Sequence, residues 1–147
     1  MTMHKYLLPP AAEEFIAKNL TAVGIPYEDA YLVATLMIQF DLAGADGHGI
    51  FRLPAYIKRI RAGGINLHPN IRREREQGAV TLIDGDNGLG HLVMARVVET
   101  AIEKVKKYSV CWVGSHHGNH SGAASVYVRK IAEAGLIGIY MAVGNAN

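Results

Sequence analysis

The sequence has little of several features that define whole classes of protein. One cysteine in 147 residues excludes an internal disulfide, and no apolar run reaches the roughly 18 residues that a membrane-spanning helix needs. The first residues combine a short apolar stretch with an early acidic pair, which is not the pattern of a signal peptide. We therefore expect a cytoplasmic protein without a membrane partner.

The excess of positive charge is also small. Lysine and arginine number 15 and aspartate and glutamate 13, and the formal net charge of +2 does not favour nucleic acid as a partner. The densest basic run, Arg72-Arg73-Glu74-Arg75, includes an acid and is interpreted as a solvated edge. Half of the residues are hydrophobic and 19% are charged, which is typical of a globular protein with a core.

The spacing of apolar residues predicts helices first, then alternating strands and helices. Proline near the start and glycine near the end of periodic segments predict helices over 9–24, 27–45 and 51–61. A polar connection or edge strand over 69–77 comes next. Beyond it we expect strand 79–83, turn 84–88, helix 90–108, strand 110–113, helix 123–134 and strand 136–143. This order favours an α/β layer architecture with a mixed, partly parallel sheet.

The last predicted strand is followed only by Gly144-Asn145-Ala146-Asn147, which looks like the start of a loop. An independent domain normally closes its own core. We therefore expect residues 1–147 to be a single domain or part of one, within a larger enzyme or hetero-oligomer. A cut, a processing point and a split gene would all explain such an end.

Three histidines, His116, His117 and His120, stand within five residues directly before a predicted helix. Histidine titrates near physiological pH, and in a strand-to-helix turn it is well placed for proton transfer. The amides that open the following helix favour an anion nearby. His120 therefore suits the reduction of a carbonyl beside a carboxylate, and the alternative is that it merely caps the helix.

The same three histidines also allow a metal site, because imidazole suits zinc and three protein ligands plus water form a known catalytic pattern. However, the turn offers no obvious carboxylate or cysteine partner, and Gly118 breaks the spacing that would align His116 with His120. We therefore expect no metal there. Cys111 lies in an apolar run and is interpreted as a buried, unreactive thiol rather than a nucleophile.

A second polar cluster lies upstream, at the entrance of the predicted third helix. His48 and Arg52 could share one pocket there, in which the planar guanidinium would bind a carboxylate through two parallel hydrogen bonds. A surface ion pair of Arg52 with Asp46 or Asp41 is equally consistent with the sequence. The glycine-rich segment 84–91 lacks the Lys-Ser/Thr pair of a triphosphate-binding loop and is interpreted as a tight turn.

Three segments, in order, resemble the malate/L-lactate dehydrogenase family of the second type, which also includes ureidoglycolate, sulfolactate and diketogulonate enzymes and a cyclic-imine reductase. They read DLAGADGHGIFRLPAYIKRIRAGGIN, DGDNGLGHLVMARVVETAIEKVKK and NHSGAASVYVRKIAEAGLIGIYMAVGNAN. The resemblance implies a nicotinamide-dependent oxidoreductase with a non-Rossmann fold, working as a dimer. Its substrate would be a small 2-hydroxy or 2-oxo acid, or a cyclic imine.

The resemblance also implies roles for single residues on the substrate side. His120 matches the histidine that transfers the proton, His48 matches the pocket histidine, and Arg52 matches the arginine that holds the substrate carboxylate. Ser121 follows the catalytic histidine, as in the ureidoglycolate branch, and is assigned to substrate binding. Gly47, in the same pocket, stands where the family usually has serine, so one polar contact is missing.

The resemblance assigns few residues of this chain to the cofactor. Members of the family continue for a further stretch at least as long as this chain, and that stretch supplies most of the dinucleotide site. Of this chain only Gly144 and Asn145 could contact the cofactor, NAD or NADP. We therefore expect a second polypeptide to complete a homodimeric assembly. The alternative is a non-redox hydrolase or lyase, or an assembly subunit, on the same scaffold, produced in one variant by chain cleavage after Asn147.

Overall fold

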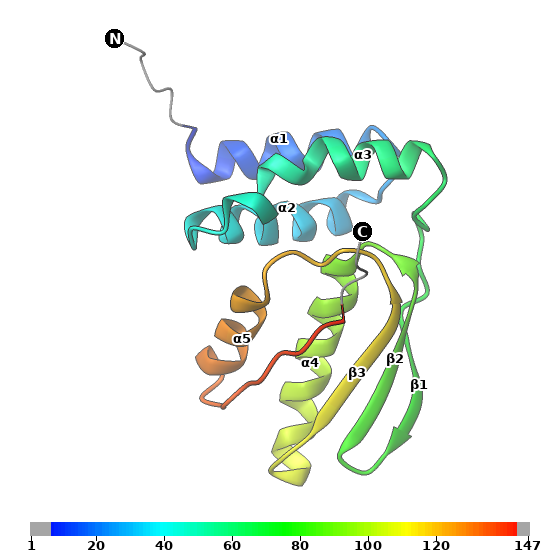
Figure 1. Cartoon of the computed structure of the whole chain (residues 1–147), viewed down its shortest axis with the longest axis vertical. Coiled ribbons are helices and arrows are strands. Elements are labelled where there is room, and N and C mark those ends of the chain that lie inside the picture. The colour runs from blue at the N-terminus through cyan, green and yellow to red at the C-terminus, as the bar shows by residue number, and fades with distance from the viewer. Residues whose placement is uncertain (1–6, 144–147) are drawn as a thin grey trace.

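The computed structural model describes residues 7–143, which form a layer of helices above a layer of sheet and helix (Figure 1). The upper layer holds α1 (Pro9–Thr21), α2 (Tyr27–Leu42) and α3 (Leu53–Arg61), with short 3₁₀ turns at Asp46–His48 and Ile50–Arg52. The lower layer holds β1 (Arg72–Gln77), β2 (Val80–Gly88), α4 (Gly90–Tyr108), β3 (Trp112–Gly118) and α5 (Ala124–Glu133). The predicted order of helices followed by alternating strands and helices is confirmed.

Helix α2 joins the two layers because it is apolar on nearly all sides. Its Val33 and Met37 are fully buried in a core shared with Ile16 and Leu20 of α1. Its Leu36 and Phe40 are fully buried in a second core, with Val98 of α4 and with Val126 and Tyr127 of α5. A helix of this composition is stable only where both faces are covered, and α2 therefore fixes the helical layer against α4 and α5.

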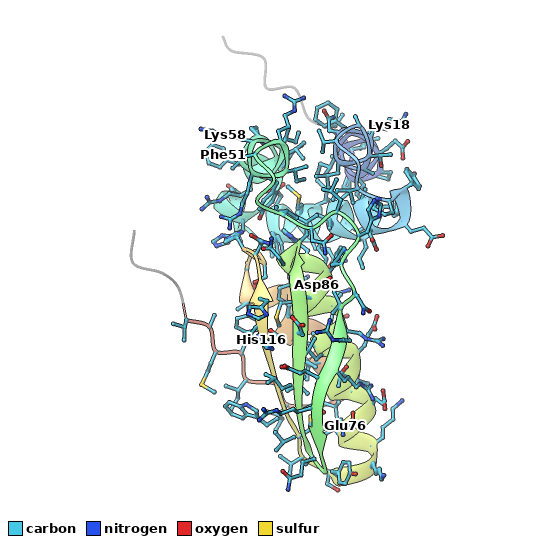
Figure 2. All side chains as sticks on the ribbon, turned by 90° about the vertical axis from the view of Figure 1, so that its right-hand side faces the viewer. Lys18, Phe51, Lys58, Glu76, Asp86 and His116 are labelled. Carbon is cyan, nitrogen blue, oxygen red and sulfur yellow. The ribbon has the colours of Figure 1, made fainter. Side chains whose placement is uncertain are left out.

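The sheet has the order β1-β2-β3 and is mixed, as the sequence predicts. Strands β1 and β2 are antiparallel, whereas β2 and β3 are parallel and joined by α4 as the crossover. Figure 2 shows α4 packed along one side of the sheet and labels His116 on β3. Pairing places Asp84 of β2 between Arg72 of β1 and His116 of β3.

The predicted turn at 84–88 is wrong, since these residues continue β2 as far as Gly88. Asp86 and Asn87 adopt left-handed φ values of 47° and 55° and form an irregularity in the pairing of β2 with β3. Asp and Asn tolerate this conformation, so the strand absorbs them as a bulge instead of reversing direction. The Asp86 carboxylate accepts hydrogen bonds from Asn66 and from the backbone of Asn70, both at 2.9 Å.

The predicted strand at 110–113 is displaced, because β3 begins at Trp112 and extends to Gly118. Parallel pairing with β2 carries the strand past its apolar residues into His116 and His117. These histidines therefore lie in a strand, and only the segment from Asn119 to Ala123 forms the turn before α5.

The predicted strand at 136–143 is not formed among the described residues, which lie there outside every helix and strand. Its side chains still alternate between exposed and packed positions. Ile137, Ile139 and Val143 are almost fully exposed, whereas Tyr140 stacks on Tyr127 with ring centroids 6.0 Å apart. A strand requires a hydrogen-bonded neighbour as well as alternation, and residues 7–143 provide none at this segment. Within the same range no helix is long and apolar enough to cross a membrane.

Candidate functional site

The turn that carries His120 is held against the first residues of α4. The side-chain amide of Asn119 donates hydrogen bonds to the carbonyl oxygens of Asn87 and Gly88, both at 2.9 Å. A Cβ atom added at Gly90 would lie 2.0 Å from the carbonyl oxygen of Asn119 and 2.6 Å from that of His120. Only glycine at position 90 permits this close approach, so a residue of α4 fixes the position of His120.

His120 does not cap the following helix. The N-cap of α5 is Ala123, and no side chain donates or accepts a capping hydrogen bond there. Instead, the His120 imidazole stacks on that of His48, with ring centroids 5.5 Å apart and planes inclined by 19°. The structure therefore brings together the two histidines that were assigned to one pocket.

Tyr56 of α3 is the third member of this cluster, and sequence reasoning missed it. Its phenol oxygen lies 2.7 Å from Nδ1 of His120. Burial raises the pKa of Tyr56 well above its ordinary value, against the opposing charge of Arg52, so the phenol stays neutral. A signal was present in the sequence, because Tyr56 follows Arg52 by four residues and positions i and i+4 share one helical face.

Partial burial lowers the pKa of His120, and the positive charges of Arg52 and His48 lower it further. The His120 imidazole is therefore neutral at physiological pH, and its protonated form is a stronger acid than an ordinary imidazolium. With Nδ1 engaged by Tyr56, the ring nitrogen left for a substrate is Nε2. The cluster can donate or accept a proton at that one atom.

Arg52 lies beside the same loop, at the end of the second 3₁₀ turn. Its Nε donates a 2.8 Å hydrogen bond to the carbonyl oxygen of Gly47, one residue before His48. No carboxylate among residues 7–143 lies within ion-pair distance of Arg52, and Asp41 instead accepts the backbone N–H of Ile50 at 2.9 Å. The guanidinium is exposed and retains donors for an external carboxylate.

A fourth aromatic ring, His91, lies beneath the cluster and was not singled out from the sequence. It is fully buried in α4, with its ring 5.3 Å from Tyr56 and 5.8 Å from Phe40, centroid to centroid. Neither ring nitrogen has a hydrogen-bond partner among residues 7–143. Burial lowers the pKa of His91 to about 3, with a smaller contribution from His120, so the ring is neutral and supports Tyr56 edge-on.

Ser121 and Gly47 were also assigned to substrate binding, and their surroundings differ. The Ser121 hydroxyl lies 3.1 Å from that of Tyr140, and the Ser121 carbonyl accepts the hydroxyl of Tyr127 at 2.5 Å. This pairing turns Ser121 toward the second core. At Gly47 a Cβ atom would meet nothing within 4 Å, so the serine usual in the family would fit there. The predicted cofactor contacts, Gly144 and Asn145, lie outside the described residues.

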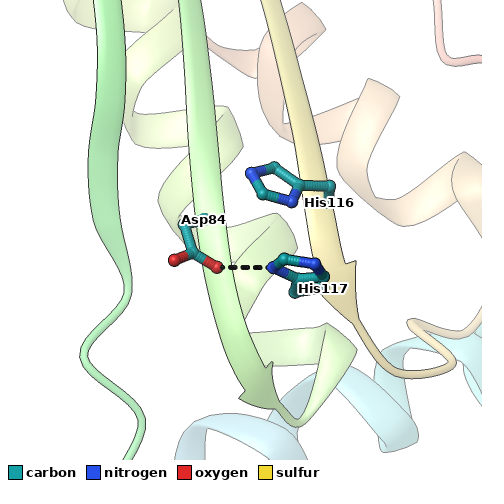
Figure 3. A group of neighbouring side chains, drawn as sticks. All are labelled: Asp84, His116 and His117. Carbon is teal, nitrogen blue, oxygen red and sulfur yellow. Dashed lines mark hydrogen bonds and ion pairs between the residues drawn. The ribbon is translucent and has the colours of Figure 1, made fainter.

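The structure separates His116 and His117 from His120. His116 and His117 lie beside Asp84 of β2, and Figure 3 shows both rings on the side of the sheet that carries this carboxylate. The backbone N–H of Asp86 lowers the pKa of Asp84, with help from His117 and Arg72. The carboxylate missing from the turn is thus supplied by the neighbouring strand, whereas His120 pairs with Tyr56.

Cys111 is half-buried, its thiol donates a hydrogen bond to the carbonyl oxygen of Ala101 at 3.4 Å, and burial raises its pKa.

A groove of about 580 Å³ lies between α1 and α3 and is separate from this cluster. Its lining is mainly apolar and includes none of His48, Arg52 and His120: Phe15, Asn19, Ile50, Leu53, Pro54, Ile57, Lys58 and Arg61. The imidazole and guanidinium groups therefore stand on an open surface of this chain rather than inside the groove.

An α/β scaffold that holds two stacked imidazoles beside a guanidinium with no ion-pair partner among residues 7–143 is suited to acid–base chemistry on a small anion. Residues 9–147 match the malate/L-lactate dehydrogenase family, and the chain belongs to that family. It is 45% identical over 127 residues to a malate dehydrogenase of Pyrococcus horikoshii, an alignment that covers 86% of this chain and 35% of that protein. It is also 38% identical to an L-sulfolactate dehydrogenase of Methanocaldococcus jannaschii, over 90% of this chain and 39% of the relative.

Solved structures of the family have the same fold. The malate dehydrogenase of Pyrococcus horikoshii superposes with a TM-score of 0.83 at 39% identity, over 92% of this chain and 41% of that one. A malate dehydrogenase of Entamoeba histolytica gives 0.85 at 35% identity, over 90% and 37%. The chain therefore spans little more than a third of the length of the relatives it matches.

Proposed function

We propose that this chain is the substrate-side part of a nicotinamide-dependent oxidoreductase that interconverts a small 2-hydroxy acid and its 2-oxo acid. The observation that supports this most directly is the cluster of His120, His48 and Tyr56 next to the guanidinium of Arg52, which has no ion-pair partner among the described residues. It combines one proton-transferring nitrogen with one carboxylate-binding group. Malate and sulfolactate, which give the relatives their names, are 2-hydroxy acids with a carboxylate adjacent to the reacting carbon.

The residues of this chain account for substrate orientation and for the proton. Arg52 binds the substrate carboxylate through its fork of donors, which places the neighbouring oxygen toward His120. During reduction Nε2 of the imidazolium protonates the oxygen as negative charge develops there, and during oxidation the neutral ring accepts that proton. The nicotinamide, when bound, supplies or accepts the hydride.

Tyr56 determines which ring nitrogen is active. After the imidazolium has released its Nε2 proton, the remaining proton is on Nδ1 and points at the phenol oxygen 2.7 Å away. The same tautomer leaves a lone pair on Nε2, as the reverse reaction requires. Tyr56 is therefore a positioning residue that acts through His120.

His120 is exposed, so its imidazole is accessible to a substrate. The two residues assigned to the cofactor lie outside residues 7–143, and we propose that a second polypeptide in a homodimeric assembly supplies most of the dinucleotide site. The dimeric assembly and the cytoplasmic location stay predictions, and the cofactor is NAD or NADP. One relative, from Escherichia coli, is named ureidoglycolate dehydrogenase (NAD(+)). Membership of a dehydrogenase family does not favour the alternative of a non-redox enzyme or assembly subunit.

The test is to isolate the native assembly, identify its chains by mass spectrometry, and follow nicotinamide absorbance on addition of 2-oxo acids. We expect a copurified polypeptide and hydride transfer that depends on the 2-oxo acid. In this assembly His120→Ala should lower turnover by about 10² to 10⁴, the usual contribution of general acid–base catalysis. An assembly that binds 2-oxo acids and both nicotinamides but transfers no hydride would contradict the proposal.

A further inference from the structure

A second cluster of metal-ligating side chains stands on the sheet, apart from the pairing of His120 with Tyr56. Asp84 of β2 and His116 and His117 of β3 each offer one ligand atom, and these atoms all lie within 4.8 Å of one another (Figure 3). The parallel register pairs Asp84 directly with His116. Asp84 is only 7% exposed, so it is a nearly buried carboxylate at the base of the cluster.

The backbone at His117 explains why both imidazoles reach the same carboxylate. Consecutive residues of a strand normally point to opposite faces of the sheet. His117 has a left-handed φ of 50°, which breaks this alternation, and the two ring centroids lie only 4.2 Å apart. A non-glycine residue in this conformation is uncommon, and such conformations concentrate at functional sites.

The proton on His116 is directed away from the cluster by Glu74. The Glu74 carboxylate oxygen lies 2.7 Å from Nε2 of His116. Because a carboxylate accepts hydrogen bonds, the Nε2 atom carries the proton, and the lone pair of the neutral ring is on Nδ1. A carboxylate that orients a histidine in this way is the usual companion of a metal-bound imidazole.

We propose that Asp84, His116 and His117 bind a divalent transition-metal ion of the zinc class. Two imidazole nitrogens and one carboxylate oxygen are a donor set that such ions prefer, and three protein ligands leave a position for water. The Asp84 Oδ1 and His117 Nδ1 atoms are 3.2 Å apart. This is close to the roughly 3.3 Å that separates two ligands around a tetrahedral ion with bonds of about 2.0 Å. The His117 side chain is 68% exposed, which gives the ion a path from solvent.

Arg72 forms an ion pair with Asp84 and should therefore weaken the binding of a cation to the same carboxylate. One guanidinium nitrogen lies 2.5 Å from Oδ2 of Asp84, the oxygen that faces away from His117. The ion takes Oδ1, in place of the hydrogen bond from His117, while Arg72 remains on Oδ2. Because the two cations then share one carboxylate, Arg72→Gln should increase the affinity for metal, whereas loss of any ligand should decrease it.

The test is calorimetric titration of the metal-stripped chain with Zn²⁺, and of the same protein with Co²⁺ while its visible absorption is recorded. We expect one ion per chain and the strong visible bands of four-coordinate cobalt. His117→Asn and Asp84→Asn should each weaken binding at least tenfold, and Glu74→Gln about 10- to 100-fold. Asparagine is chosen at position 117 because it tolerates left-handed φ, so the variant removes the imidazole without straining the backbone.

His68→Gln is the matched control, since His68 is outside the cluster and its substitution should leave zinc affinity unchanged. Circular dichroism of each variant shows that the fold is retained. No saturable binding of either ion below about 1 mM, or wild-type affinity in both His117→Asn and Asp84→Asn, would overturn the site. These readouts do not involve hydride transfer, so they are independent of the proposed oxidoreductase activity.

Discussion

The phenol oxygen of Tyr56 lies 2.7 Å from Nδ1 of His120, so a neutral group orients the proposed proton-transferring imidazole. A carboxylate in that place would raise the pKa of His120 by stabilising its charged form. The phenol does so much less, and partial burial with the charges of Arg52 and His48 keeps this pKa low. The imidazolium is therefore a stronger acid than an ordinary one, which suits the protonation of an oxyanion.

Replacing Tyr56 by phenylalanine should slow reduction more than oxidation. The ring shape is kept, but the imidazolium loses its hydrogen-bond acceptor, so the pKa of His120 falls further. A hydrogen bond to a charged group contributes about 1.5 kcal/mol or more, which corresponds to roughly tenfold in rate. We expect turnover of 2-oxo acids at neutral pH to fall about tenfold, with its pH profile moved to lower pH. Equal losses in both directions and an unmoved profile would indicate a purely structural role.

Two substitutions of Arg52 should separate its charge from its geometry. Lysine keeps the charge but cannot present two parallel donors, so Arg52→Lys should raise KM about 10- to 100-fold with little change in kcat. Its effect on the pKa of His120 should be small. Arg52→Gln removes the cation as well, so the pKa of His120 should rise in an NMR titration of the imidazole. A wild-type KM in Arg52→Lys would remove Arg52 from the substrate site.

Gly90→Ala should displace the turn that carries His120, because the new Cβ would lie 2.0 Å from the carbonyl oxygen of Asn119. Overpacking of this kind costs about 1–3 kcal/mol in unfolding free energy, and a shift of the turn lowers turnover. Gly114→Ala in β3 is the matched control, since its Cβ would make an ordinary 3.6 Å contact with Leu82. Chemical denaturation should show a loss only for Gly90→Ala, and equal stability of the two variants would contradict the described packing.

The elements predicted most accurately are the helices, whose positions depend on the local spacing of apolar residues. Helices α1 to α4 follow from apolar spacing with proline and glycine at their ends, and the structure gives them within a few residues. The bulge at Asp86 and Asn87 was predicted as a turn, because whether a left-handed pair reverses the chain depends on the neighbouring strand. Segment 136–143 has the alternation of a strand, but alternation does not supply the hydrogen-bonded partner.

The same distinction applies to the site. His48, Arg52 and His120 were identified through family resemblance, and the structure places the two imidazoles in contact. Tyr56 was missed although it lies one helical turn beyond Arg52, because a tyrosine on an amphipathic helix is more often part of the core. The pairing of Asp84 with His116 arises from sheet register, which the sequence does not reveal for two residues 32 positions apart.

His91→Leu should make the chain more resistant to acid. The buried His91 has a pKa of about 3 in the folded chain, against about 6.5 when unfolded, so only the unfolded state takes up this proton between those values. As pH falls through this window, the unfolding free energy should drop by about 1.4 kcal/mol per pH unit on account of His91, whereas above pH 6.5 the group adds no pH dependence. Leucine fills the apolar site without a titrating group and removes this contribution. Urea denaturation at pH 7, 6, 5 and 4 should therefore show a smaller loss of stability in the variant. Curves that stay parallel to those of the wild type would mean that His91 takes up a proton in the folded state and is not shielded between Phe40 and Tyr56.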